Sequence, residues 1–273
     1  MTINKIVFIG AGNMSGAIIE GMIASGVSPE SIHTTNRSDE KCRYWAEKGL
    51  TAHQSNLEAL QDAEVVVLGV KPNMMNDLLS EISSAIPKHA TVISVAAGVP
   101  YNNYRHFLPT QTIARTMPNT PCLVGTGVVG VYYGDQINQA TVELVESLFN
   151  PIAMVHTCKT EDEIDLVIAA AGSAPAYFFL FIESIINAAQ RLGLEPEAAA
   201  KMVKQTALGA AQMTVSSTDT PQTLRRNVTS PGGTTHEAVV RFQNDGLEQM
   251  TEHAMRDCIA RAKEMAAQLT LNK

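Results

Sequence analysis

The feature that most constrains the fold lies at the start of the chain, where the apolar run KIVFIG leads directly into AGNMSGAI. This order predicts a strand, a tight turn and a helix. Gly10 suits the turn, Gly12 lets the backbone approach a diphosphate, and Gly16 lets the helix pack close to the strand. The alternative is a tight turn without a ligand. The loop therefore predicts a dinucleotide site whose members are Gly10, Gly12, Asn13, Met14 and Gly16.

Strand-like and helix-like segments alternate through the first half of the chain. Apolar runs at 31–36, 64–70, 91–98 and 111–118 are separated by helical patterns, and runs at 125–134 and 151–157 complete the predicted sheet. Such alternation is typical of a parallel sheet covered on both faces. From residue 161 the patterns are helical only, at 162–192, 197–216, 233–245 and 247–269. We expect an α/β N-terminal Rossmann-type doubly wound sheet (1–160), followed by an all-α C-terminal domain for substrate binding and dimerisation (161–273).

Two features of the helical half refine this expectation. Gly172 and Pro175 interrupt the segment 162–192, which should bend or break there. YFFLFIESIINAA is apolar around most of its circumference, so it is either buried in a core or packed against a second subunit. We expect interlocked dimers, because a helical half of about 110 residues has little to bury such elongated patterns alone.

Composition excludes several classes of protein. The chain of 273 residues is 45% hydrophobic and 17% charged, which supports a folded core. A net charge of −7 without a Lys/Arg block argues against nucleic acid and anionic membranes as partners. No stretch approaches the roughly 20 apolar residues that span a bilayer, and there is no signal-peptide layout. The four cysteines and seven histidines lack metal-ligand spacing, so we expect no metal site and a cytoplasmic protein with reduced thiols.

The residues after the second strand favour one cofactor. Asn36, Arg37 and Ser38 stand where NAD enzymes usually place an acid, and a guanidinium with two neutral polar groups suits a 2′-phosphate. Asp39 and Glu40 then begin the next helix, where acids complement the dipole. Ser38 has the alternative role of a helix N-cap. The cofactor predicted is NADPH, with NADH as the weaker alternative.

Three further loops follow predicted strands at the ligand-binding edge. Lys71 could face the cofactor or simply be solvated, and small residues after the next strand would admit a flat nicotinamide ring. Asn119 lies between two prolines, in a rigid polar loop that could also be an ordinary turn. The predicted contacts are Val70, Lys71, Pro72, Ala96, Ala97, Gly98 and Asn119.

A second anion site is predicted late in the chain, at SPGGTT (230–235). Pro231 suits the first turn of a helix, and the glycines leave the following N–H groups unshielded. A plain cap needs one hydroxyl, whereas two glycines near a helix cost on the order of 1 kcal/mol each. The segment therefore favours a cradle for a carboxylate or phosphate over a simple cap, built from Ser230, Gly232, Gly233, Thr234 and Thr235.

NVTSPGGTTHEAV, preceded by TPQTLRR, resembles the signature of the pyrroline-5-carboxylate reductases. FIGAGNMSGAI, VVLGVKP, ISVAAGV, RTMPNTP and AAAGSAPAYFFLFIESI resemble the same family in the same order, so that the likeness covers residues 3 to about 267. His236 and residues 241–243 depart from the family pattern without touching the proposed ligand groups. The resemblance implies reduction of L-1-pyrroline-5-carboxylate to L-proline by NADPH, in a homodimer that assembles further.

The resemblance also implies roles for individual residues. Thr235 would hydrogen-bond the ring nitrogen and is the catalytic candidate, while Ser230 and the N–H groups near Gly233 and Thr234 would hold the carboxylate. Asn56 would contact the adenosine part. Two rivals remain: a β-hydroxyacid dehydrogenase, which would need a catalytic lysine after Gly172 where none occurs before Lys201, and a non-catalytic NADPH sensor, which has no need of SPGGTT.

Overall fold

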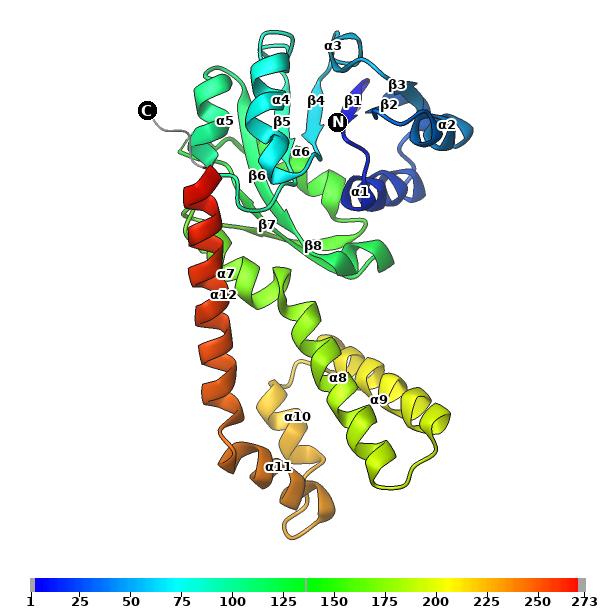
Figure 1. Cartoon of the computed structure of the whole chain (residues 1–273), viewed down its shortest axis with the longest axis vertical. Coiled ribbons are helices and arrows are strands. Elements are labelled where there is room, and N and C mark those ends of the chain that lie inside the picture. Colours follow the sequence, from blue (N-terminus) through cyan, green and yellow to red (C-terminus); the bar gives the residue numbers. More distant parts are fainter. Residues whose placement is uncertain (1–2, 136, 270–273) are drawn as a thin grey trace. The chain divides into compact units, whose positions relative to one another are not determined.

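A single sheet organises the N-terminal part of the protein in the computed structural model, which describes residues 3–135 and 137–269. Its strand order is β3-β2-β1-β4-β5-β6-β7-β8 (Figure 1). The first six strands are parallel, in the order typical of dinucleotide-binding folds. The strands are β1 Ile6–Ile9, β2 Ile32–Thr35, β3 Thr51–His53, β4 Val65–Leu68, β5 Thr91–Ser94, β6 Thr112–Pro118, β7 Gly127–Tyr132 and β8 Ala153–Thr157.

The expectation of a wholly parallel sheet was wrong at one edge. β7 pairs antiparallel with β6, and β8 runs parallel to β7, so the last two strands oppose the other six. The connection from β6 to β7, residues 119–126, contains only the 3₁₀ turn Thr120–Val124. A parallel crossover needs about a dozen residues or more, so this short connection forces the chain to reverse.

Side chains from alternate positions of the strands form two cores, one on each face of the sheet. In β1, Ile6 and Phe8 belong to one cluster and Val7 and Ile9 to the other. Helices α1, α2 and α6 cover the first face, and α3, α4 and α5 the second. These helices are α1 Asn13–Ala24, α2 Asp39–Glu47, α3 Asn56–Ala59, α4 Met75–Ile82, α5 Tyr101–Phe107 and α6 Gln139–Phe149. The doubly wound fold is thereby confirmed.

Several elements were absent from the sequence interpretation. They are β3, α3, α6 and the later α10 (Pro221–Asn227). Three or four residues are too few to show a period, which explains β3 and α3. In the opposite direction, the strand expected at 91–98 ends at Ser94, and residues 95–98 form a loop.

The chain forms two compact units, of which one contains the sheet together with residues up to Ser173 and from Cys258 on, and the other is Ala174–Asp257. The sheet unit therefore includes α7 (Glu163–Val167) and the last part of α12 (Leu247–Leu269). Side chains of α7 and α12, among them Ile164 and Ala262, form a small third core. The boundary placed at residue 160 stays a prediction.

The interruption expected at Gly172 and Pro175 is present. Residues Ile168–Gly172 form a π-helical turn, closed by the bond from Ser173 N to Ile168 O (2.7 Å), and α8 begins at Ala174. Pro175 has no N–H to donate to the carbonyl of Ala171 four residues earlier. That carbonyl instead accepts a hydrogen bond from Asn119 Nδ2 (3.0 Å). Because Pro175 lacks an N–H, the Ala171 carbonyl is free to accept the hydrogen bond from the loop that follows β6.

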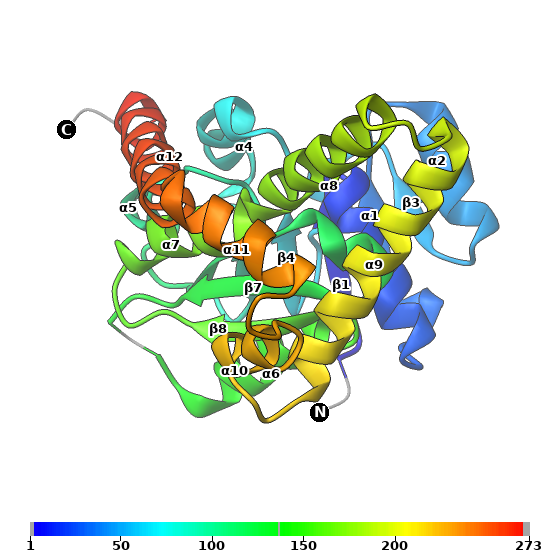
Figure 2. The same ribbon diagram turned by 90° about the horizontal axis from the view of Figure 1, so that it is seen from below.

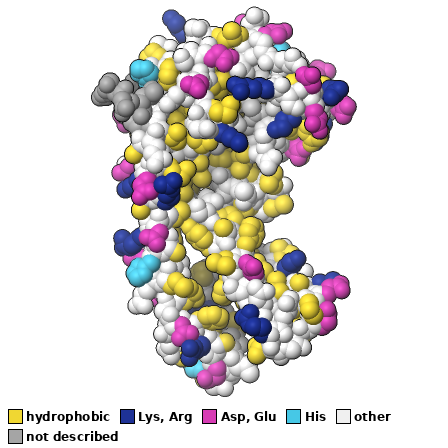
Figure 3. Space-filling view, viewed as in Figure 1, with side chains coloured by type: hydrophobic (Ala, Val, Ile, Leu, Met, Phe, Trp, Pro, Cys, Tyr) yellow, Lys and Arg dark blue, Asp and Glu magenta, His cyan; other side chains and the backbone are white. Residues whose placement is uncertain are grey.

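The second unit is helical. α8 (Ala174–Arg191) and α9 (Pro196–Ser216) lie side by side as a hairpin (Figure 2), followed by α10 and α11 (Thr234–Asn244). Phe181 of α8 meets Phe242 of α11 edge to face at 5.8 Å. Few apolar side chains of α8 are covered, since Phe178, Phe179 and Leu180 are 68%, 65% and 63% exposed. Figure 3 shows hydrophobic side chains at the surface along this helix.

The helical segment formed by α7, the π-helical turn and α8 corrects the expectation that no stretch of the chain is long and apolar enough to span a bilayer. By length and composition, Glu163–Arg191 is a candidate membrane span among the described residues, with a mean hydropathy of 1.7 over its most apolar window. The same composition is found in helices that pack against protein. A large exposed apolar face on a folded chain indicates an interaction surface.

Candidate functional site

The glycine loop forms an open helix start at the carboxyl edge of the sheet. Gly10 adopts φ +85°, which favours glycine, and its N–H donates to Thr35 O (3.1 Å). Gly12 precedes α1 without a side-chain cap, and the bond from Gly16 N to Gly12 O (2.7 Å) closes the first turn. The N–H groups of Asn13, Met14 and Ser15 therefore have no acceptor within the helix. These free N–H groups at the start of α1 can donate hydrogen bonds to an anion.

Two residues that the sequence interpretation missed fix this loop from beneath. Ser15 is 1% exposed, and its hydroxyl donates to Gly10 O (2.9 Å). A Cβ at Gly69, the residue after β4, would overlap both Ser15 Oγ and Gly10 O. A Cβ at Gly12 would meet nothing within 4 Å. The loop is thus packed on its inner side and open on its outer side, which fits a bound diphosphate.

Gly16 has a different structural role from the one expected. A Cβ there would stand 3.4 Å from the ring of Trp45 on α2. Gly16 therefore faces α2 and not the strand, at a distance that an added Cβ would tolerate. Beside it lies a hollow of about 310 Å³ whose lining includes Gly12, Asn13 and Gly16.

A larger hollow, of about 920 Å³, is lined by Ile3, Asn4 and Gly26 among others. It lies at the opposite end of β1, at the amino ends of the strands. Dinucleotides bind at the carboxyl ends of such sheets, so the larger hollow is not where we expect the cofactor.

The residues after β2 offer polar groups that have no partner in the described chain. Asn36 Nδ2 is buried and makes no hydrogen bond there. Ser38 precedes α2 as its N-cap, yet its hydroxyl makes no capping bond, and the Arg37 side chain is exposed. Asp39 and Glu40 do begin α2, and Asp39 Oδ1 accepts a bond from Gln54 Nε2. A buried amide without a partner is rare, so Asn36 fits a site that a ligand completes.

The other predicted contacts follow neighbouring strands. β4 lies between β1 and β5, so the loops after these three strands meet at one edge of the sheet. Lys71 there is exposed, and Gly98 adopts φ +76°. This edge brings together Val70, Lys71, Pro72, Ala96, Ala97 and Gly98. Asn56 begins α3, where its Nδ2 donates to Glu81 Oε1 (3.2 Å).

Asn119 is the predicted contact with the least to offer a ligand. It is 6% exposed, and both ends of its amide are engaged within the protein. Oδ1 accepts from Val128 N (2.9 Å), and Nδ2 donates to Ala171 O (3.0 Å). The side chain joins the end of β6 to β7 and to the π-helical turn. Its backbone is engaged as well, since Asn119 N donates to Val128 O (3.1 Å) and Asn119 O accepts from Cys122 N (3.2 Å). Its cofactor role stays a prediction.

The late segment forms a turn followed by an uncapped helix start, in the helical unit. Gly233 N donates to Ser230 O (3.0 Å), with Pro231 and Gly232 between them and Gly232 at φ +69°. These are the marks of a type II turn. Pro231 therefore lies in the turn and not, as expected, in the first turn of α11, which begins at Thr234.

This geometry leaves groups available for an anion. The type II turn requires a positive φ at Gly232, so this glycine is explained without a ligand. The presence of two glycines is therefore weaker support for an anion site than the sequence suggested. Gly233 caps α11 without a side chain, and the first helical bond runs from Glu237 N to Gly233 O (3.3 Å). The N–H groups of residues 234–236 thus have no acceptor within the helix. The side chains of Ser230, Thr234 and Thr235 are exposed beside them.

Comparison with known proteins gives the same family over the whole chain. Residues 161–265 match the family model described as pyrroline-5-carboxylate reductase dimerisation, and residues 5–98 match one described as NADP oxidoreductase coenzyme F420-dependent. The pyrroline-5-carboxylate reductase of Pseudomonas aeruginosa is 38% identical over 98% of this chain and 99% of its own. This chain belongs to the pyrroline-5-carboxylate reductase family.

Solved structures of family members agree in fold. The reductase from Coxiella burnetii has a TM-score of 0.93 at 37% identity, with coverage of 97% of this chain and 99% of that one. The pyrroline carboxylate reductase of Plasmodium falciparum, solved with NADP bound, has a TM-score of 0.85 at 27% identity, with coverage of 97% and 99%. The family resemblance and the fold class are confirmed, and the roles of individual site residues stay predictions.

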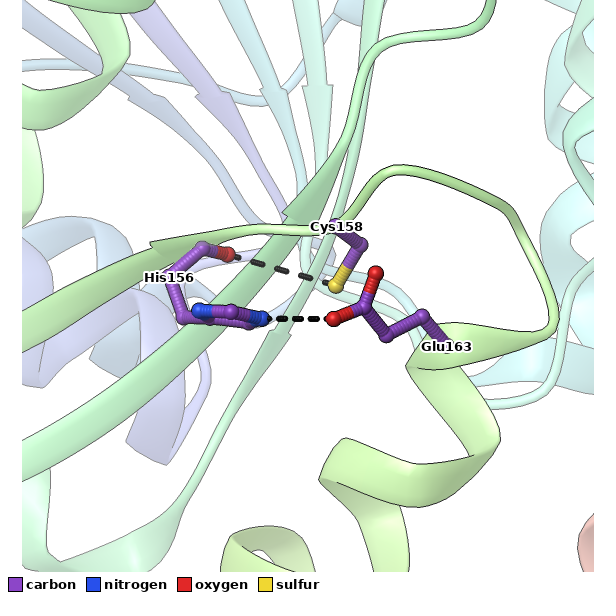
Figure 4. Close-up of side chains that lie close together, drawn as sticks. All are labelled: His156, Cys158 and Glu163. Carbon is purple, nitrogen blue, oxygen red and sulfur yellow. Dashed lines mark hydrogen bonds and ion pairs between the residues drawn. The ribbon is translucent and has the colours of Figure 1, made fainter.

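One cluster of side chains in this protein has the composition of a metal site. His156, Cys158 and Glu163 bring one ligand atom each to within 4.8 Å of one another (Figure 4). The sequence interpretation did not find it, because the spacing matches no common motif. His156 Nε2 lies 2.9 Å from Glu163 Oε1, and Glu163 Oε2 accepts from Lys159 N (2.7 Å).

The contacts explain this cluster without a metal. Burial, with the charge of Glu163, raises the pKa of Cys158 to about 11, so the thiol is protonated at neutral pH. A metal would have to remove that proton and displace bonds from both oxygens of Glu163. The group instead joins the end of β8 to the start of α7 over a buried thiol.

Proposed function

We propose that this protein reduces L-1-pyrroline-5-carboxylate to L-proline, the last step of proline biosynthesis, with NADPH as the hydride donor. Membership of the family over nearly the whole chain supports the reaction. The observation that favours this substrate most directly is the start of α11, where N–H groups and exposed hydroxyls of a Ser-Pro-Gly-Gly-Thr-Thr turn converge. A carboxylate fits such a start.

The protein's own groups have simple tasks in this reaction. The N–H groups of residues 13–15 hold the diphosphate, and Asn36, Arg37 and Ser38 hold the 2′-phosphate. NADPH, when bound, supplies the hydride. The reaction needs no Ser-His-Asp arrangement, because a protonated cyclic imine is already electrophilic and mainly requires correct placement.

At the substrate, Ser230 and the N–H groups near Gly233 and Thr234 hold the carboxylate. The hydroxyl of Thr235 hydrogen-bonds the ring nitrogen and fixes the orientation of the C=N bond. Because Thr235 and Ser230 belong to one turn and one helix start, the acid group and the nitrogen of the substrate are fixed by a single local structure.

We also propose the assembly and the compartment. The chain carries the family's dimerisation region at 161–265, and the exposed apolar residues of α8 lie within it. Homodimers that associate into a larger homo-oligomer would bury this surface. A cytoplasmic location is supported by free thiols at Cys42, Cys122, Cys158 and Cys258, as reducing compartments favour.

Oxidation of NADPH, followed by its absorbance, tests the function. We expect consumption with pyrroline-5-carboxylate and none with a keto acid. Oxidation only with a keto acid would favour the dehydrogenase rival, and none with any substrate would favour the sensor.

The variant Thr235→Ala tests the role of the hydroxyl. We expect kcat to fall on the order of 100-fold, as when one hydrogen bond to the reacting group is lost, while the Kd for NADPH stays within about 2-fold. Thr214→Ala is the matched control, because Thr214 is an exposed helical threonine whose hydroxyl bonds its own helix at Ala210 O. Loss of NADPH binding in Thr235→Ala would contradict the assignment.

A further inference from the structure

The loop after β5 is held at its first residues by a buried serine. The chain leaves the strand at Ser94, which is 0% exposed, and the N–H of Ala96 donates to Ser94 Oγ (3.3 Å). Val95 N donates to Leu68 O (3.1 Å), so the neighbouring strand holds the same point. The serine hydroxyl therefore fixes the direction in which Ala96, Ala97 and Gly98 leave the sheet.

A buried tyrosine of α5 completes this arrangement. The hydroxyls of Ser94 and Tyr104 lie 2.6 Å apart, and Tyr104 is also 0% exposed. Thr116 Oγ1 donates to Ser94 O (2.8 Å) from the next strand. Burial raises the pKa of Tyr104, so its hydroxyl stays protonated and has no acid-base role at neutral pH. Without access to water, neither hydroxyl can replace the other's bond with a solvent bond.

The residue before Tyr104 on α5 bonds another element near the loop. Asn103 Nδ2 donates to Leu269 O (2.6 Å) at the end of α12. Leu269 Cδ1 is 3.9 Å from where a Cβ would stand on Gly98, so the end of α12 lies near the far end of the loop. The hydrogen bonds that link α5 to the loop act at its first residues, through Ser94.

We propose that Tyr104 is a positioning residue for hydride transfer, acting through Ser94 to fix the Ala96–Gly98 loop beside the nicotinamide ring. This inference rests on the proposed function and on the prediction from the sequence that the small residues of this loop admit the nicotinamide ring. Tyr104 touches neither cofactor nor substrate. Its effect is on the alignment of the donor, to which rates of transfer are steeply sensitive.

The test uses three variants, namely Tyr104→Phe, Ser94→Ala and the double variant that carries both changes. Each is compared with the control variant Tyr101→Phe. Tyr101 is a matched control on the same helix, buried, with its hydroxyl donating to Tyr133 O (3.0 Å) and not to the loop. We expect kcat to fall about 10-fold or more in both single variants, with the Kd for NADPH within about 2-fold. The double variant should lose no more than Ser94→Ala alone, because that change already removes the bond to Tyr104 together with the acceptor for Ala96 N.

A kinetic isotope effect separates positioning from simple loss of structure. With NADPH deuterated at the transferred position, the isotope effect on kcat should rise in Tyr104→Phe, since misalignment slows the hydride step itself. An isotope effect and kcat equal to those of Tyr101→Phe would overturn the proposal. If Tyr104→Phe fails to fold, Ser94→Ala gives the same reading with a smaller change.

Ala97→Leu distinguishes failure of this inference from failure of the proposed function. If this bulky change in the loop alters neither kcat nor the Kd for NADPH, the ring does not lie there and the positioning role is wrong, whereas failure of the proposed function would be the absence of NADPH oxidation with pyrroline-5-carboxylate in the unchanged protein. If Ala97→Leu is damaging while Tyr104→Phe and Ser94→Ala behave like Tyr101→Phe, only the positioning role is wrong.

Discussion

Gly12→Ala is the sharpest perturbation of the cofactor site, because its effects on binding and on stability should differ in sign. Gly12 has φ −84° and ψ −164°, which alanine adopts without strain, and its added Cβ meets no atom within 4 Å. The free energy of unfolding should therefore stay constant or rise by about 0.4–1 kcal/mol. The methyl group would stand where a diphosphate approaches the N–H groups of α1. Crowding of about 1–3 kcal/mol would raise the Kd for NADPH by about 5- to 150-fold.

Gly69→Ala is the contrasting variant for the same loop. Its Cβ would overlap Ser15 Oγ and Gly10 O, so the free protein itself should lose about 1–3 kcal/mol of stability. Urea denaturation without ligand measures stability, and titration of NADPH fluorescence measures affinity. If Gly12→Ala bound NADPH as tightly as the unchanged protein, the diphosphate would not rest on the start of α1. If Gly12→Ala were as unstable as Gly69→Ala, the space beside Gly12 would not be open.

Three further predictions address other regions. Arg37→Ala should narrow the preference for NADPH over NADH by about 10-fold or more, as loss of a charged hydrogen bond implies, and an unchanged ratio of kcat/KM values would refute the 2′-phosphate role. Phe178→Glu, at a side chain 68% exposed in the single chain, should weaken self-association by about 10-fold or more in sedimentation, whereas a dimer of unchanged affinity would exclude this face. Burial lowers the pKa of His33 from 6.5 to about 4, so the unfolded chain binds its proton first and stability should fall as pH drops from 6.5 toward 4. His33→Gln should flatten that part of the urea midpoint against pH, and an identical profile would contradict the reasoning.

Local chemistry allowed much of the fold to be predicted from the sequence. The continuous apolar run from Ile6 to Ile9 predicted a short strand, and the alternation of strands and helices predicted a sheet covered on both faces, which the two cores confirm. Gly172 and Pro175 predicted the interruption before α8, because a residue without an N–H cannot continue the helical bonds. These features depend on residues within a few positions of one another, and the sequence displays such neighbours directly.

Contacts between residues far apart in the sequence were not predicted. The sequence suggested Asn119 as a cofactor ligand, yet its amide is occupied by Val128 and Ala171. Gly69 looked like an ordinary residue after a strand until the structure placed it against Ser15. Nothing local distinguishes such a side chain from one that is exposed to solvent.

By itself, the sequence determined the strand–loop–helix start, the alternation of strands and helices in the first half, the break before α8 and the polar segment before α11. Only the tertiary structure decided the direction of β7 and β8, the burial of Ser94 with Tyr104, and which polar groups near the cofactor edge lack a partner. The physical reason is that backbone preference acts over a few neighbouring residues, whereas strand direction and hydrogen-bond partners depend on which distant segments the folded chain brings together.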